Sequence, residues 1–554
     1  MHILSEAAIF LTAKIRRHLP FCSYREYSPH LSNFQGKHFV VPPGNYLINF
    51  FMLTGSRASG YPLEKKLYQL IITRLDGEDV PLMSYRQHIF KLAEKGIGGF
   101  IIFGGKRDEV KHFIAEIQSI PEMPLFIASD VERGAGQQIQ GCTLFPCQMA
   151  VTASIDGNDP EHIAILHSAI EAIAHEVKET GINMPLIPVL DVNKNPDNPI
   201  ICTRAFSDDP EVVAWFGSRY IRTLESSGLM SCAKHFPGHG DTSADSHISL
   251  PVINKSLRAL MDTDIWPFKE AIRAGVSCIM LGHLNIPALD NKPSSLSGKV
   301  IRRLLREELG FNGLVLTDAL NMQALKNIDK VPSKSIGAGA DILLHPVDPH
   351  AAVKELIAAV ESGEIAEEDV DIAFNRIVKA KERFRDVKRY EIDYQEHERL
   401  SAWLTAGSIT LYRNTVGVLP VSDRDHVLLV FSGDDKLYKS SPLRNYFDNV
   451  SSVNDRIEAT NRVLIIAVFT SVAAWKGSSG IAEDEKSRIH KLIESAEKSI
   501  VVSFGSPYVL RHFKEADVLM AAYEATDQAQ RAVIKCLEGR MEFKGRPPVK
   551  IDIH

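Results

Sequence analysis

The sequence predicts an α/β protein in which a (β/α)8 TIM-type barrel is followed by a smaller α/β domain. Three observations support this prediction. The chain has 554 residues, of which 45% are apolar and 24% are charged, so at about 150 residues per domain it can form more than one globular core. Short apolar runs alternate with amphipathic stretches up to residue 344. A second alternation of the same kind begins at residue 427.

The first alternation contains eight apolar runs of strand length, and stretches of helical character separate them. Eight strands that alternate with helices are typical of a (β/α)8 barrel. Two of the helices have well-marked ends, because Asp159-Pro160-Glu161 and Asp209-Pro210-Glu211 offer a capping Asp before a first-turn Pro, and Gly181 and Gly228 follow as stops. The eight runs comprise residues 70–72, 98–103, 124–128, 186–190, 230–233, 276–281, 313–316 and 341–344.

The second alternation predicts a smaller α/β domain with a parallel sheet. Its apolar runs comprise residues 427–431, 463–468, 500–504 and 518–521. A charged helix at about residues 370–390 precedes it, so we expect the barrel over residues 61–390 and the second domain over residues 391–554. Residues 1–60 show no steady period and contain Pro42-Pro43-Gly44, which predicts an extension outside both domains and without a function of its own.

Composition argues against several classes of partner. The formal net charge is −6, so the chain lacks the basic excess that would attract a nucleic-acid backbone. Seven scattered cysteines without a Cys-x-x-Cys pair suit a reducing compartment. No apolar run reaches the roughly 18 residues of a membrane span, and the charges near the N-terminus are in the reverse order of a secretory signal. We therefore expect a cytoplasmic protein without a membrane span.

Polar residues follow four of the apolar runs at the point where each strand should end. They are Asp130, Lys234 with His235, His283, and Asp318. Any one of them could be a helix cap or a solvated strand end. In a (β/α)8 barrel, however, the carboxyl ends of the strands form one face, and barrel enzymes carry their chemistry there. The four together predict a functional site on that face.

The segment Lys234–His247 carries three His and two Asp residues. Pro237 with Gly238 and Gly240 excludes a helix, so the segment is expected to be a strand end that runs into a loop. A solvated loop is one interpretation. A metal site is another, but a His-x3-His pair usually ligates from a helix. Asp245 and His247 are two residues apart and would project to the same side, which makes them a candidate proton-transfer pair.

This segment, Lys-His-Phe-Pro-Gly-His-Gly-Asp-Thr ending in Asp-Ser-His, resembles the signature of family 3 glycoside hydrolases, in particular their β-N-acetylglucosaminidase branch. Further stretches similar to the family occur in the same order, and Phe504–Tyr508 resembles part of the α/β sandwich domain that follows the barrel in many members. The resemblance covers all but the first 60 residues. The further stretches are Pro188–Val192, Asn198-Pro199 with Arg204–Phe206, Pro287–Asp290 and Leu316–Met322.

The resemblance implies a retaining exo-glycosidase that releases terminal β-linked N-acetylglucosamine from cell-wall (peptidoglycan) fragments and needs no metal or other cofactor. It implies that Asp318 is the nucleophile and that Asp245 with His247 forms the acid/base pair. A His with a pKa near 6.5 can serve as that acid/base at neutral pH. It also implies that the hydroxyl groups of the terminal sugar are held by Asp130, Arg204, Lys234 and His235.

The sequence departs from the family pattern in one loop. Most members have Asp-x-Glu-Gly-Gly-Arg-Val, whereas this chain has Asp130–Gln138 with Arg133 in an altered position, so the loop arginine is either missing or moved to Arg133.

Three other functions stay open. A β-glucosidase of the same family would take its acid/base Glu from the C-terminal domain, and the loop ending at His247 argues against it. A glycoside phosphorylase is another, because an acid/base without negative charge repels phosphate less than a carboxylate does. A non-catalytic sugar-binding paralogue should have lost Asp318 or the Asp245 and His247 pair, and all three residues are present.

Overall fold

The computed structural model describes residues 60–553 apart from 244, 247, 386–390, 416, 422, 460–461 and 473–477. Residues 1–59 of the expected extension and the candidate acid/base His247 therefore lie outside the described residues. No helix within the described part of the chain is long and apolar enough to cross a membrane.

The first eight strands are all parallel and form a barrel. They pair in two groups, in the orders β4-β3-β2-β1-β8 and β5-β6-β7. Isolated parallel bridges between Val189 and Lys234 and between Leu316 and Ile342 connect the groups, which confirms the barrel that the sequence predicts. The strands are β1 (Ile71–Asp76), β2 (Gly99–Phe103), β3 (Phe126–Ser129), β4 (Met184–Pro185), β5 (Cys232–Phe236), β6 (Cys278–Leu281), β7 (Leu314–Thr317) and β8 (Leu343–Leu344).

The fourth strand differs from the prediction for residues 186–190. Regular pairing ends at Pro185, and within the predicted run Val189 makes the bridge to β5. Pro188 has no N–H to donate to a ladder, which accounts for the interruption. The run is nevertheless buried and carries the chain to Asp191 at the barrel mouth.

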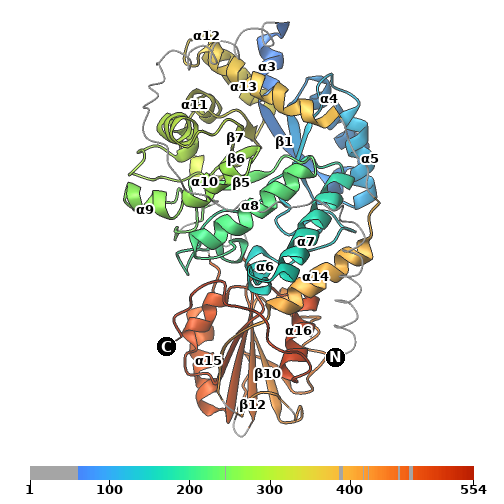
Figure 1. Cartoon of the computed structure of the whole chain (residues 1–554), viewed down its shortest axis with the longest axis vertical. Coiled ribbons are helices and arrows are strands. Elements are labelled where there is room, and N and C mark those ends of the chain that lie inside the picture. Colours follow the sequence, from blue (N-terminus) through green and yellow to red (C-terminus); the bar gives the residue numbers. More distant parts are fainter. Residues whose placement is uncertain are drawn as a thin grey trace, which may run out of the picture. The chain divides into compact units, whose positions relative to one another are not determined.

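Helices surround the barrel strands (Figure 1). The predicted caps are present, since the side chains of Asp159 and Asp209 accept hydrogen bonds from the N–H groups of Glu161 and Glu211. The helices of this part are α3 (Leu63–Gln69), α4 (Met83–Glu94), α5 (Arg107–Gln118), α6 (Gln148–Ser154), α7 (Pro160–Glu179), α8 (Pro210–Ser226), α9 (Leu257–Asp262), α10 (Trp266–Arg273), a π-helix (Lys299–Glu308), α11 (Val331–Ala338), α12 (Pro349–Glu361) and α13 (Glu367–Lys381).

The second sheet has the order β11-β10-β12-β13-β14-β9. Its pairs are parallel except that β9 lies antiparallel to β14 at one edge. The four predicted strands are present, and the two edge strands were not predicted. The elements are α14 (Tyr394–Ser408), β9 (Thr410–Asn414), β10 (Val427–Gly433), β11 (Val450–Ser452), β12 (Val463–Phe469), α15 (Glu483–Ser495), β13 (Lys498–Phe504), β14 (Val518–Ala521) and α16 (Asp527–Leu537).

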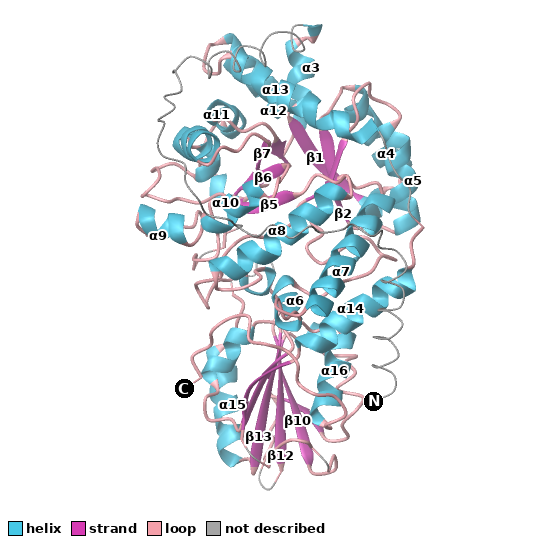
Figure 2. Ribbon diagram, viewed as in Figure 1, coloured by secondary structure: helices cyan, strands magenta, loops and turns pink. Residues whose placement is uncertain are grey.

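Both faces of this sheet are buried, and α15 and α16 lie on opposite sides of it (Figure 2). Along β12, Ile466 faces the cluster that contains Ile489 of α15, whereas its neighbour Ile465 faces the cluster that contains Val533 of α16. Strands buried on both faces appear in the sequence as continuous apolar runs. This arrangement confirms the α/β sandwich.

Candidate active site

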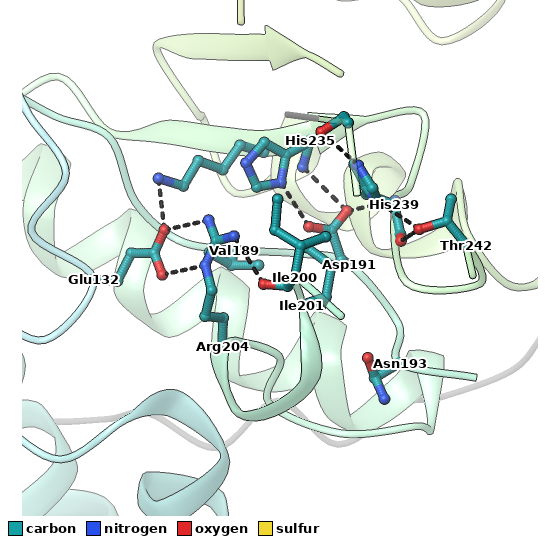
Figure 3. A network of polar contacts seen from close by, with 12 residues as sticks. Glu132, Val189, Asp191, Asn193, Ile200, Ile201, Arg204, His235, His239 and Thr242 are labelled. Atoms are coloured by element: carbon teal, nitrogen blue, oxygen red, sulfur yellow. Dashed lines mark hydrogen bonds and ion pairs between the residues drawn. The ribbon is translucent and has the colours of Figure 1, made fainter. Parts of the chain in front are cut away.

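A cluster of four buried or half-buried charged residues lies at the carboxyl ends of β3 and β5. Asp130 and Glu132 follow β3 directly, Lys234 lies in β5, and Arg204 ends a short 3-10 helix (Cys202–Arg204). Lys234 Nζ is 2.6 Å from Asp130 Oδ1 and 2.7 Å from Glu132 Oε1. Arg204 donates from Nε to Glu132 Oε2 at 2.9 Å and from Nη2 to Glu132 Oε1 at 2.7 Å. Glu132 therefore joins the two cations (Figure 3).

The electrostatics of this cluster keep Glu132, Arg204 and Lys234 ionised. Burial alone would raise the pKa of Glu132, but Arg204 and Lys234 hold it well below its usual range. For Lys234 the signs are reversed: burial would lower its pKa, but the carboxylates of Asp130 and Glu132 raise it. The side chain of Lys234 is 2% exposed, whereas that of Asp130 is 32% exposed. Asp130 and Arg204, whose side chain is 24% exposed, are thus the members most open to a ligand hydroxyl.

Asp191 organises a second network beside the first. Its Oδ2 is 2.7 Å from His235 Nδ1, and its Oδ1 accepts hydrogen bonds from the N–H groups of His235 at 3.2 Å and His239 at 2.7 Å. A carboxylate can only accept, so His235 Nδ1 carries the proton. Although burial opposes ionisation, His235 holds the pKa of Asp191 below its usual value. Asp191 thereby fixes the His235 ring and the start of the loop (Figure 3).

His239 connects the start of this loop to the segment that carries the candidate pair. Its Nδ1 is 2.9 Å from Thr242 Oγ1, and its Nε2 is 3.1 Å from Ser246 Oγ. Burial lowers the pKa of His239 to about 4, against the opposing effect of Asp191, so the ring is neutral at pH 7. Asp245 next to Ser246 is buried, and its carbonyl oxygen accepts from the N–H group of Ile248 at 2.9 Å.

Asp318 follows β7 and is half-buried. Its N–H donates to the carbonyl oxygen of Leu281 at 2.9 Å, and its Oδ1 accepts from the N–H of Ala319 at 2.7 Å. His283, another strand-end residue of the prediction, is fully buried between Ala319 O at 3.2 Å and Ser295 Oγ at 2.7 Å. Since a carbonyl only accepts, His283 Nε2 donates and supports the backbone beside Asp318.

The structure thus brings three of the predicted sugar-binding residues into one cluster: Asp130, Lys234 and Arg204. The residue that connects them, Glu132, was given no role from the sequence, although its Asp-x-Glu spacing from Asp130 was a usable signal. Asp191 was also missed. His235 lies in the neighbouring network, Asp318 follows β7 on the same barrel face, and Asp245 lies in the loop that follows β5.

Arg133, in the altered loop after β3, makes contacts away from the Asp130 cluster. Arg133 forms an ion pair with Glu524 of the second domain, and its Nε donates to the carbonyl oxygen of Phe145 at 3.1 Å. These partners lie outside the Asp130 cluster. Arg133 therefore joins the β3 loop to the second domain. No group of three or more His, Cys, Asp or Glu side chains in the described part of the chain is arranged to hold a metal ion.

Comparison with known proteins agrees with this geometry. Residues 62–380 match the model of the glycosyl hydrolase family 3 N-terminal domain, which is more than half of the chain. The chain belongs to glycoside hydrolase family 3. The resemblance stated from the sequence is confirmed, and with it the expectation of a glycoside hydrolase at the level of the family.

This family 3 chain is similar to several known proteins. It is 32% identical over 379 residues to β-hexosaminidase A of Pseudoalteromonas piscicida, covering 61% of this chain and 63% of that protein. It is 27% identical over 508 residues to a β-N-acetylglucosaminidase/β-glucosidase of Cellulomonas fimi, covering 82% of this chain and 88% of that protein. A solved family 3 β-N-acetylglucosaminidase from Paenibacillus sp. str. FPU-7 is 28% identical, with a TM-score of 0.74, and the match covers 89% of this chain and all of that one.

Proposed function

We propose that this chain is an exo-acting β-N-acetylglucosaminidase that releases terminal β-linked N-acetylglucosamine from peptidoglycan-derived fragments by a retaining mechanism. The observation that carries the proposal is the buried Asp130, Glu132, Arg204 and Lys234 cluster on the barrel face that also bears Asp318. The names of the similar proteins support the choice of sugar. The six cysteines in the described residues are free thiols, which supports a reducing compartment, and we propose the cytoplasm.

Binding of the terminal sugar falls to the cluster and to His235. Asp130 accepts from sugar hydroxyls, while Lys234 and Arg204 donate to them. Glu132 does not need to contact the sugar. It keeps the two cations in place and compensates their charge inside the protein, so little reorganisation is needed when the substrate binds.

The chemistry proceeds in two steps. An Asp318 oxygen attacks the anomeric carbon as the bond to the leaving oxygen breaks, and His247, oriented by Asp245, gives its proton to that oxygen. The neutral imidazole then takes a proton from water as the water oxygen attacks the anomeric carbon, and the bond to Asp318 breaks and restores its carboxylate. The sugar is released with its original anomeric configuration.

A β-glucosidase activity is the second candidate, because the Cellulomonas fimi relative carries both names. In that alternative a Glu of the C-terminal domain would be the acid/base. Among the described residues, Glu524 is a carboxylate of that domain that contacts the β3 loop, but it is engaged by Arg133, the Cys147 N–H and Thr526. This engagement favours the loop pair as the proton donor.

A comparison of substrates tests the proposal. The 4-nitrophenyl β-glycosides of N-acetylglucosamine and of glucose should be assayed with and without inorganic phosphate, together with a disaccharide of N-acetylglucosamine β-linked to N-acetylmuramic acid. We expect a higher kcat/KM on the N-acetylglucosaminide, cleavage of the disaccharide, and free sugar as the product in both buffers. Preference for glucose would favour the β-glucosidase, and a sugar phosphate as the main product would favour a phosphorylase.

A further inference from the structure

Lys255 lies where the long loop after β5 returns to the barrel, two residues before α9. Its Nζ is 2.9 Å from Asp241 Oδ2 and 2.8 Å from Asp264 Oδ2. Asp241 belongs to the outgoing limb of the same loop. The ion pair between Lys255 and Asp241 therefore joins the two ends of residues 242–254, the segment that contains Asp245 and His247.

The outgoing limb is held against the chain that follows β4. The N–H and Nδ2 groups of Asn195 donate to Gly240 O at 3.3 Å and to Thr242 O at 3.0 Å, and Asn198 Nδ2 donates to His239 O at 2.9 Å. On its other side this limb touches Asp264. Gly238 has a φ of +126°, and a Cβ there would lie 2.7 Å from the Cβ of Asp264.

The return limb is held by backbone hydrogen bonds to the chain that follows β6. The N–H of Ile253 donates to Asn285 O at 2.9 Å, and the N–H of Asn285 donates to Pro251 O at 2.9 Å. Each limb thus has its own attachment to the barrel. The Lys255 ammonium connects one limb to the other through its contact with the Asp241 carboxylate.

Lys255 pairs with one buried carboxylate, Asp264, and with one partly exposed carboxylate, Asp241. Asp264 is fully buried and also accepts from Thr263 Oγ1 at 2.5 Å, so it fixes the position of Lys255. Burial would lower the pKa of Lys255, but Asp264 and Asp241 raise it, and the ammonium stays charged. The side chain of Asp241 is 28% exposed, so a change at Asp241 leaves the buried pair between Lys255 and Asp264 intact.

We infer that Lys255 is a positioning residue for proton transfer, because its ion pair with Asp241 joins the two ends of the segment that carries Asp245 and His247. The inference rests on the proposed role of these two residues as the acid/base pair. Lys255 itself need not contact the substrate. A displaced proton donor should slow the step that needs protonation and leave binding of the terminal sugar unchanged.

Asp241→Asn tests the inference with the full chain, because it removes the cross-loop ion pair and keeps the pair between Lys255 and Asp264. We expect kcat on the disaccharide to fall about tenfold, the cost of about 1.4 kcal/mol in barrier height, with KM within about twofold of wild type. The first step on the nitrophenyl glycoside should hardly change. Asp241→Glu should restore part of the loss. Asp262→Asn is the matched control, since it removes an exposed ion pair with Arg258 on α9 outside the loop.

Hydrogen exchange gives a readout that does not depend on activity. The N–H groups of Ile248 and Ser249 donate to Asp245 O, and we expect them to exchange faster in Asp241→Asn than in wild type or Asp262→Asn. Unchanged exchange together with unchanged kcat would overturn the inference, as would equal losses on both substrates.

His247→Ala, assayed in parallel, separates failure of this inference from failure of the proposed function. If its loss does not depend on the leaving group, the proposed function fails and takes this inference with it. If its loss does depend on the leaving group while Asp241→Asn behaves as wild type, this inference alone fails.

Discussion

Replacing Glu132 by Gln should impair the enzyme even though the new side chain has the same shape. Glu132 Oε1 accepts from both Arg204 and Lys234, and Oε2 accepts from Arg204. A glutamine amide has only one oxygen, so in either orientation its NH₂ group meets at least one cationic N–H donor. A lost hydrogen bond to a charged group costs about 1.5–3 kcal/mol, and breaking a buried ion pair costs about 3–5 kcal/mol.

A loss of about 3 kcal/mol corresponds to roughly a 10²-fold fall in kcat/KM, which can be measured on the nitrophenyl N-acetylglucosaminide. Glu524→Gln is a matched control, because Glu524 is equally buried at 6% exposed and is also paired with an arginine, but lies outside the cluster. We expect the control to lower the melting temperature and to keep kcat/KM within about threefold of wild type. If folded Glu132→Gln kept more than about a tenth of the wild-type kcat/KM, the cluster would not be organised by Glu132.

Three further predictions concern other parts of the chain. Replacing the Asp and Glu residues of 400–554 one at a time should leave the alkaline limb of the pH profile in place, because that limb reports loss of the proton from the acid/base residue. A single replacement that removes it would move the proton donor to the second domain. A chain that begins at Tyr61 should fold and turn over substrate normally, since Tyr61 already packs on Phe374 of α13; loss of soluble expression would contradict this. The pKa of His239 is about 4 in the folded chain and about 6.5 in the unfolded chain, so between these values the unfolded chain binds one more proton. The melting temperature should therefore fall as the pH is lowered from 6.5 to 4. His239→Gln should flatten this slope in calorimetry, and an equal slope would refute the assignment.

The barrel was predictable because its strands are buried on both faces and appear as uninterrupted apolar runs. The run at 98–103, for example, corresponds to β2 at Gly99–Phe103. The edge strands of the second sheet lack this signal. In β9, Thr410 is buried while the residues after it are half-buried or exposed, and β11 has three half-buried residues. A half-buried edge strand of this length cannot be told from a loop by hydrophobicity alone.

The site was predictable where a polar residue ends an apolar strand and not where its role depends on a distant partner. Asp130 and Lys234 stand out in this way, and they meet across 104 residues of sequence. Glu132 and Asp191 gain their roles only from partners that the fold brings to them, and Arg133 meets Glu524 across 391 residues. No local pattern encodes such contacts.

The most direct test of the central claim is whether a sugar becomes covalently attached to Asp318 when the proton donor is removed. His247→Ala should be mixed rapidly with the nitrophenyl N-acetylglucosaminide, because a nitrophenolate departs with little help from an acid while the second step still needs a base. We expect a pre-steady-state burst and a protein mass increased by one N-acetylglucosaminyl group, mapped to the peptide that contains Asp318. His247→Ala combined with Asp318→Asn should show neither. A sugar attached elsewhere, or no burst together with equal losses on the nitrophenyl glycoside and the disaccharide, would contradict the proposed mechanism.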